Sequence, residues 1–248
     1  MRIPVQVLGG PTVLIGYGGL RFLTDPTFDD PGDYPAPSGR VLTKTAPPRT
    51  PLAELGPVDI VLLSHDQHAD NLDHSGRALL AAVPRTFTTP AAAGRLGGRT
   101  EPLTPWQSVE LPRPDGGALT VTAAPALHGP EGSEPIVGEV TGFLLTAADL
   151  PTVYVSGDNA SLDLVKEIAV RYGPVDTAVL FAGAPRLPVL DNALLVLDGK
   201  GTATAAQLLR ARRVVAAHCD SWAHFTEGRE DVVRAFEEAG LADVLQPA

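Results

Sequence analysis

The chain has 248 residues, of which 44% are hydrophobic and 19% are charged, and these values are typical of a globular protein rather than a disordered one. Its formal net charge of -10 at pH 7 argues against general binding to the phosphate backbone of nucleic acids and to anionic membrane surfaces. A single cysteine excludes an internal disulfide, and the sequence contains no apolar run of about 18 residues that would predict a membrane span. We therefore expect a cytoplasmic protein.

The N-terminal part of the chain predicts a meander of short antiparallel strands. Apolar runs of strand length, separated by pairs of glycines, occur at 3–8, 12–17 and 20–24. The next stretch, 26–57, is rich in Pro, Gly and Asp, so we expect a long loop that flanks a functional site. A buried strand over 58–64 then leads directly into a polar cluster at 65–73, followed by a helix to about residue 83.

The second half of the chain repeats this alternation of strands and helices. The expected strands are 119–124, 142–146, 152–156, 177–181 and 213–217. The expected helices are 162–171, 202–210 and the amphipathic segment 230–239. Two strand-rich halves with attendant helices predict an α+β fold of one domain over residues 1–248, with two sheets packed face to face and helices outside.

Histidine or aspartate side chains follow four of the expected strands. These residues are His65 and His68 after 58–64, His128 after 119–124, Asp158 after 152–156, and His218 after 213–217. Imidazole and carboxylate groups are the ligands of zinc and related divalent ions, and loops at one rim of a sheet commonly present reactive groups. A single histidine in such a place is more often hydrogen-bonded than bound to a metal, but five such positions predict a shared metal site.

The order of these residues resembles the metallo-β-lactamase-fold hydrolases. The signature of that family is His-x-His-x-Asp-His after a strand, then a distant His, a distant Gly-Asp and a last His. The matching positions here are His65 to Asn71, His128, Asp158 and His218. The resemblance covers nearly the whole chain and implies a four-layer αβ/βα sandwich. Its C-terminal segment, 218–227, is similar to that of the L-ascorbate-6-phosphate lactonase-like branch.

The motif after the strand departs from the family pattern. An extra residue between His65 and His68 would keep both histidines and Asp70, but Asn71 would then replace the last histidine of the motif. Other alignments place Asp66 or Gln67 at a ligand position, and these alternatives stay open. Every alignment loses at least one ligand, so we expect one metal position to be altered or weakly occupied.

The resemblance implies a role for each candidate residue. His65, His68 and His128 would hold a first metal, Asp70 and His218 a second metal, and Asp158 would bridge the two. The implied cofactor is Zn²⁺ or Mn²⁺, with one or two ions per chain, and the implied nucleophile is a metal-bound hydroxide. Asp70 is also a candidate for orienting the nucleophile.

Other residues are weaker candidates for a role in the site. His224 is a candidate for protonating a leaving group or binding an anionic substrate, and a histidine packed between two aromatic residues is an equal alternative. Asp25 is expected to cap a turn and to support a metal-binding histidine. We expect His74 to be exposed and Cys219 to be buried and inert.

Three functions are compatible with these residues. The first is a metal-dependent hydrolase that acts on a small lactone, ester or phosphoester. The others are a phosphodiesterase that acts on nucleotides and a non-catalytic binding protein with a degenerate metal site. The expected partners are a small-molecule substrate and, in a homo-oligomer, further copies of the chain.

Overall fold

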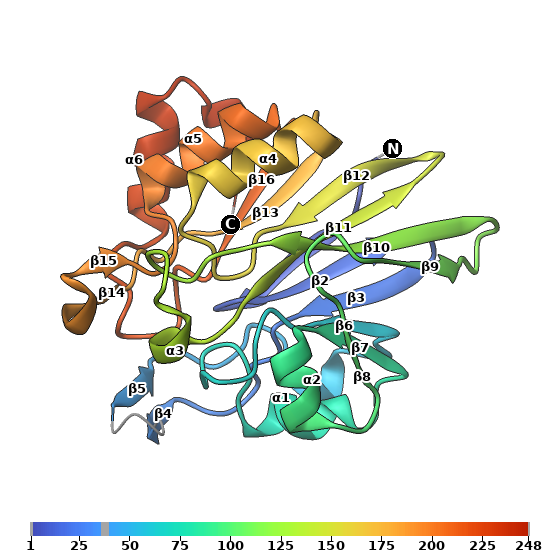
Figure 1. The fold of residues 1–248 in the computed structure, drawn as a ribbon, viewed down its shortest axis with the longest axis horizontal. Coiled ribbons are helices and arrows are strands. Elements are labelled where there is room, and N and C mark those ends of the chain that lie inside the picture. Colours follow the sequence, from blue (N-terminus) through green and yellow to red (C-terminus); the bar gives the residue numbers. More distant parts are fainter. Residues whose placement is uncertain (1, 36–39, 248) are drawn as a thin grey trace.

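The computed structural model describes residues 2–35 and 40–247, and Figure 1 shows two large sheets packed together with helices outside them. The N-terminal sheet has six strands in the order β1-β2-β3-β6-β7-β8. The first three pair antiparallel, as the meander prediction requires, and β3, β6, β7 and β8 pair parallel. The strands are β1 (Val5–Gly9), β2 (Thr12–Tyr17), β3 (Leu20–Thr24), β6 (Ile60–Leu62), β7 (Arg85–Thr88) and β8 (Thr100–Pro102).

The C-terminal sheet also has six strands, in the order β16-β13-β12-β11-β10-β9. Strands β9 to β12 pair antiparallel, so β10 and β12 run in the same direction, and β13 and β16 are parallel to β12. The carboxyl ends of β10, β12, β13 and β16 therefore lie at one edge of the sheet. The strands are β9 (Ser108–Pro112), β10 (Ala118–Pro125), β11 (Thr141–Ala147), β12 (Leu150–Val155), β13 (Thr177–Phe181) and β16 (Arg213–Ala217).

Apolar side chains bury both faces of each large sheet. In the short strand β6, Ile60 and Leu62 belong to the core between the sheets, whereas Val61 belongs to the core beneath α1 (His74–Leu80). Burial on both faces explains why this strand is a continuous apolar run in the sequence. The outer face of the C-terminal sheet packs against α4 (Leu162–Tyr172), α5 (Gly199–Leu209) and α6 (Arg229–Glu238). The predicted α+β sandwich of four layers is confirmed.

The prediction of one long loop over 26–57 is wrong in part. The stretch contains the hairpin of β4 (Gly32–Pro35) and β5 (Val41–Lys44) and the short helix η1 (Leu52–Glu54), while residues 36–39 lie outside the described part. Strand β4 has the sequence Gly-Asp-Tyr-Pro and is mostly exposed, so it carries none of the buried alternation by which a strand is recognised.

Several short elements complete the described structure. They are α2 (Pro90–Leu96), α3 (Glu134–Val137), β14 (Arg186–Leu187), η2 (Pro188–Leu190), β15 (Ala193–Leu194) and η3 (Ala242–Val244). Among the described residues, no helix has both the length and the apolar character that crossing a membrane requires.

Candidate metal centre

The predicted site residues converge where the two large sheets meet at one edge. His128, Asp158 and His218 follow β10, β12 and β16, whose carboxyl ends lie together. His65 and His68 reach the same place from the loop that follows β6 in the other sheet. Residues separated by more than 150 positions in the sequence thus share one site because parallel strands end at a common edge.

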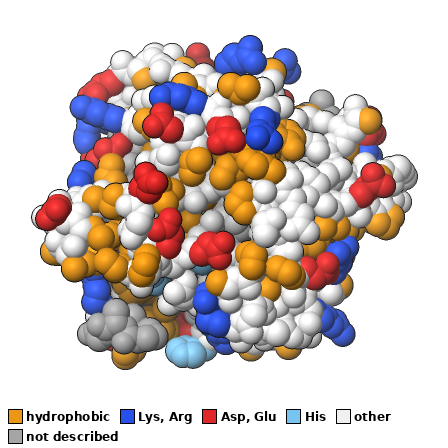
Figure 2. All heavy atoms as spheres, viewed as in Figure 1, with side chains coloured by type: hydrophobic (Ala, Val, Ile, Leu, Met, Phe, Trp, Pro, Cys, Tyr) orange, Lys and Arg blue, Asp and Glu red, His pale blue; other side chains and the backbone are white. Residues whose placement is uncertain are grey.

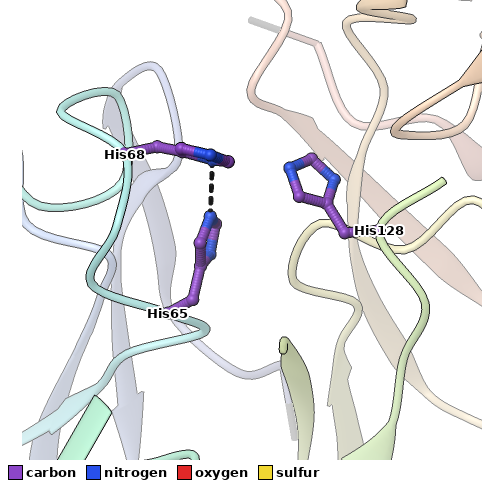
Figure 3. Close-up of side chains that lie close together, drawn as sticks. All are labelled: His65, His68 and His128. Carbon is purple, nitrogen blue, oxygen red and sulfur yellow. Dashed lines mark hydrogen bonds between the residues drawn. The ribbon is translucent and has the colours of Figure 1, made fainter. Parts of the chain in front are cut away.

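Three histidines form a compact cluster within this site. One ring nitrogen from each of His65, His68 and His128 lies within 4.8 Å of the others. Figure 3 shows His65 and His68 on one loop and His128 facing them from the opposite loop. The ring centroids of His65 and His68 are 4.8 Å apart, and each lies 5.3 Å from that of His128. Three converging imidazoles are a donor set that suits a zinc-like ion.

Burial keeps two of these imidazoles neutral at physiological pH. Burial, with the nearby His68, lowers the pKa of His65 well below its ordinary value. Burial, with the nearby His128, lowers the pKa of His68 to about 4. A metal binds only the unprotonated imidazole nitrogen, so protons at neutral pH offer little competition for these two positions.

A chain of hydrogen bonds fixes which nitrogen of His65 faces the cluster. The hydroxyl of Ser64 donates to Oδ1 of Asp25 over 2.7 Å and lies 3.0 Å from Nδ1 of His65, from which it can accept. The backbone N–H of Ser64 donates to the same carboxyl oxygen over 2.8 Å. Placing the His65 proton on Nδ1 leaves the Nε2 lone pair directed at His68, 2.8 Å away. This geometry agrees with the support role expected of Asp25.

A backbone carbonyl orients His128 in the same way. Nδ1 of His128 lies 2.8 Å from the carbonyl oxygen of Leu195, which can only accept a hydrogen bond. The Nε2 lone pair of His128 is therefore free on the side that faces Asp158, with Oδ2 of that residue 3.6 Å away. The sequence carried no signal for Leu195, because a backbone acceptor has no residue-type signature.

Carboxylates and the remaining site histidines form the other side of the centre. Oδ1 of Asp158 lies 3.4 Å from Nε2 of His218, so this carboxylate lies between His128 and His218. Oδ2 of Asp70 lies 3.5 Å from Nε2 of His218 and 3.0 Å from Nε2 of His224. Asp70, Asp158 and His218 are buried. The structure thus brings together all six residues predicted as metal ligands.

Charge pairing governs the protonation of this second side. Burial acts to raise the pKa of Asp158, but His218 and the neighbouring histidines outweigh it and hold that pKa well below its usual range. His224 lowers the pKa of Asp70 in the same way, against the effect of burial. The pKa of His218 is raised because Asp158 and Asp70 outweigh its desolvation. The two carboxyl groups are therefore ionised at neutral pH.

Several buried polar atoms at the centre lack hydrogen-bond partners among the described residues. They are Oδ1 of Asp70, Oδ1 of Asn71 and Nδ1 of His218, while Nε2 of His218 has only the longer ion-pair contacts of 3.4 and 3.5 Å with Asp158 and Asp70. A buried polar atom with no partner costs about 1–3 kcal/mol, so such atoms concentrated in one place point to a bound group. Anionic oxygens and imidazole nitrogens that converge in this way fit a divalent cation.

Asn71 lies beside this second side with its amide group turned toward a carboxylate. Its Nδ2 donates to Oδ1 of Asp158 over 3.0 Å, and it lies 3.5 Å from the hydroxyl of Ser64. This amide N–H brings partial positive charge to the carboxylate of Asp158. Asn71 therefore lies next to the candidate ligands Asp158 and His218, and its nitrogen rather than its oxygen faces Asp158.

Asp66 and Gln67, the alternative ligands, make their contacts outside the cluster. Both carboxylate oxygens of Asp66 accept from the guanidinium of Arg95, with Nε 3.0 Å from Oδ1. Gln67 is exposed, and its amide lies against Gly138, which follows α3. Each of these side chains is engaged by a different partner, which favours the alignment that retains His65 and His68.

The remaining candidates lie as their sequence contexts suggested. The side chain of His224 is 21% exposed, contacts Asp70 and packs on Phe225 with ring centroids 4.5 Å apart, so it is both a site neighbour and a packed histidine. The side chain of His74 is 87% exposed, as predicted. Cys219 is buried in the core beside the helices, where burial raises its pKa to about 12.

The centre opens into a cavity of about 800 Å³. His68, Asp70, His128, Asp158 and His224 line one part of it, and its other lining residues are mainly apolar. Arg40 and Leu42 are among the lining residues, so part of the stretch 26–57 does flank the site, as predicted. The rest of the lining comes from α3 and from 185–195, which the sequence analysis left without a role.

Residues 20–219 match the family model described as "Beta-lactamase superfamily domain". A UPF0173 metal-dependent hydrolase of Pyrobaculum aerophilum is 25% identical over 247 residues, which cover 97% of this chain and 95% of that protein.

Two solved structures have the same fold as this chain. The isothiocyanate hydrolase from Delia radicum gut bacteria superposes with a TM-score of 0.81 at 22% identity, covering 98% of this chain and 96% of that one. A possible metal-dependent hydrolase from Veillonella parvula superposes with a TM-score of 0.82 at 17% identity, covering 98% and 95%. The family model spans most of the chain, and these structures share its sandwich, so the chain belongs to the β-lactamase superfamily domain family.

Proposed function

We propose that the protein is a metal-dependent hydrolase acting on a small substrate that carries a lactone, ester or phosphoester group. One observation carries the proposal: a cluster of three histidines, two of them buried, lies beside two buried carboxyl groups at a cavity large enough for a small molecule. The relative from Pyrobaculum aerophilum is named a metal-dependent hydrolase, which supports the same activity for this chain.

The chain's own residues divide the work of such a reaction. His65, His68 and His128 would hold a metal, which when bound supplies a Lewis acid and lowers the pKa of a water molecule. Zn²⁺ or Mn²⁺ fits this set of nitrogen and oxygen donors. The neutral state of His65 and His68 keeps their lone pairs available for that ion.

Asp70 and His224 are suited to handling protons at the cavity. Asp70 is ionised, lines the cavity and has an unpartnered Oδ1, so it can accept a hydrogen bond from the attacking water and orient it. His224 also lines the cavity and lies 3.0 Å from Asp70, so it can carry a proton to a leaving group that enters there.

The second candidate is a binding protein that kept the fold and lost full metal occupancy. The hydrogen bond from Asn71 to Asp158 is the observation that favours it, because an amide occupies the place of a motif histidine. The three-histidine cluster is intact, however, and this favours the hydrolase.

The two candidates differ in a reconstitution experiment. The metal-free protein would be loaded with Zn²⁺ or Mn²⁺ and assayed against a panel of lactones, aryl esters and phosphodiesters. The hydrolase proposal predicts turnover that requires the metal, is lost in His128→Ala and is retained in His74→Ala, whose side chain is exposed. A protein that holds metal stoichiometrically but hydrolyses no member of the panel would contradict the proposal and favour the binding protein.

A further inference from the structure

The cavity has two kinds of lining. One part consists of the site histidines and aspartates, and the rest, called the wall here, has a different chemistry. Beyond the site histidines and aspartates, the lining side chains are apolar except for two exposed arginines, Arg40 and Arg186. The apolar lining residues are Leu42, Ile136, Val137, Pro185, Leu187, Pro188, Val189 and Leu195. Such a lining offers few hydrogen-bonding groups to a polar sugar or a nucleotide.

The wall comes from segments that lie outside both large sheets. They are the β4–β5 hairpin, α3, and the β14–η2–β15 segment, and Figure 1 shows them on the same side of the molecule. Val137, Leu187 and Leu195 pack together in a small buried cluster of their own. Packing therefore holds the inner part of the wall in place. In Figure 2, hydrophobic side chains gather on the left of this face, where Figure 1 places β14 and β15.

The wall also leaves large apolar side chains open to water. Ile136 is 50% exposed and Val189 is 69% exposed, and both line the cavity. Few large hydrophobic side chains among the described residues are as exposed, and the apolar surface of these two would be removed from water by a molecule bound in the cavity.

The lining has few cationic groups that could bind an anionic substrate. Apart from the site histidines, they are Arg40 and Arg186, and both are exposed. The guanidinium of Arg186 already donates to the carbonyl oxygen of Asn192 over 2.8 Å. Among the described residues, the lining therefore offers no buried lysine or arginine to an anionic group.

We infer that the substrate is a neutral carboxylic ester or lactone whose acyl part is an apolar chain or ring. The inference rests on the proposed function and names its substrate class. In the reaction, the oxygen of a water molecule bonds to the acyl carbon, and the bond from that carbon to the ester oxygen breaks. One proton passes to the departing alkoxide and the other is released from the carboxylic acid product. The apolar acyl part lies against Ile136 and Val189.

A chain-length series of p-nitrophenyl esters, from acetate to octanoate, tests this inference on the metal-loaded protein. Each methylene that fully leaves water on binding should raise kcat/KM about fourfold. Burial of only two to three of the additional methylenes of octanoate would therefore make its kcat/KM about 30-fold higher than that of acetate. The variants Ile136→Ser and Val189→Ser should lower the octanoate-to-acetate ratio about three- to tenfold. Val170→Ser is the matched control, because Val170 is 87% exposed on α4 and lies outside the cavity lining.

Binding of methyl ketones, which cannot be hydrolysed, separates the substrate class from the activity. Calorimetry should show 2-decanone binding more tightly than 2-butanone, and Val189→Ser should reduce that difference. Ester hydrolysis with a flat or falling chain-length series, or a preference for anionic phosphodiesters, would overturn the inference and leave the hydrolase proposal standing. If no ester, lactone or phosphodiester is hydrolysed, the hydrolase proposal fails. In that case, a ketone affinity that rises with chain length would still support an apolar binding pocket. A ketone affinity that does not rise would contradict it.

Discussion

Both sides of the metal centre contain histidines, but carboxylates belong to one side. On the histidine side, His65 is buried and His68 is half-buried among other imidazoles, and desolvation lowers their pKa values. On the carboxylate side, His218 is buried but lies next to Asp158 and Asp70, and its pKa is raised. Desolvation therefore outweighs the carboxylates at His65 and His68, whereas the carboxylates outweigh desolvation at His218.

This difference predicts unequal affinities for metal ions. On the histidine side, His65 and His68 make one hydrogen bond of 2.8 Å to each other and, among the described residues, contact no charged partner there, so a metal ion has only this neutral contact to displace. On the carboxylate side, His218, His224 and the amide of Asn71 already pair with Asp70 and Asp158. A second ion must displace those contacts, so we expect one tight site and one weaker site.

Weakening the hydrogen bonds that orient His65 should have the largest effect on metal binding at the histidine side. Asp25→Asn should weaken the acceptor of both Ser64 hydrogen bonds and so loosen the orientation of His65. Loss of a group that orients a metal ligand typically costs about 10- to 100-fold in affinity, and we expect Zn²⁺ binding to fall in that range. Asp33→Asn, on the exposed strand β4, is the matched control. Unchanged Zn²⁺ affinity in Asp25→Asn would show that the Ser64–His65 contact does not position the ligand.

The neutral state of His68 predicts how the metal-free protein responds to acid. Its folded pKa is about 4, below the unfolded value of about 6.5, so between these pH values the unfolded chain binds more protons. Its contribution to stability is complete above about pH 6.5 and is lost as the pH falls toward 4. From pH 7 to pH 4.5 the wild type should lose about 2 kcal/mol more unfolding free energy than His68→Gln.

Urea unfolding of the metal-free proteins across this pH range would measure the difference. His74→Gln provides the comparison, because the side chain of His74 is 87% exposed and its removal should leave the pH slope of the wild type in place. Parallel pH curves for wild type and His68→Gln would mean that His68 is not held neutral by burial.

Restoring the motif histidine should raise the metal affinity of the carboxylate side. Asn71→His replaces the amide that donates to Asp158 with an imidazole that can bind an ion, so the weaker site should gain about tenfold in affinity. Asn71 is fully buried, so thermal melting must first show that the variant folds. If the variant folds and the weaker affinity does not change, Asn71 does not occupy the second metal position.

The sequence predicted the strand framework well because its signals are local. Strands β2, β3, β13 and β16 have the expected bounds, since apolar runs bounded by glycines or polar residues mark buried strands. It did not predict β7 (Arg85–Thr88) or α2 (Pro90–Leu96), which are short and have no clear apolar period. Single-domain organisation over 1–248 and the lactonase-like branch stay predictions.

The site could be predicted only to the extent that residue types identify it. Histidines and aspartates that follow strands are visible in the sequence, so the ligand candidates can be identified from the sequence alone. The pairing of Asp66 with Arg95, 29 positions away, was not visible, and neither was the carbonyl of Leu195 beneath His128. The apolar cavity wall was missed for the same reason, because its residues come together only through tertiary packing.

Metal binding to the three-histidine cluster underlies every function proposed for this protein, and ions can be counted in matched variants. Elemental analysis and calorimetric titration with Zn²⁺ would compare the wild type, His128→Ala and the exposed-histidine control His74→Ala. We expect one tight ion per chain in the wild type and the control. In His128→Ala, binding should weaken by more than about 100-fold, beyond the usual effect of losing an orienting group. Failure of the wild type to bind Zn²⁺ or Mn²⁺, or undiminished tight binding in a folded His128→Ala protein, would contradict this expectation.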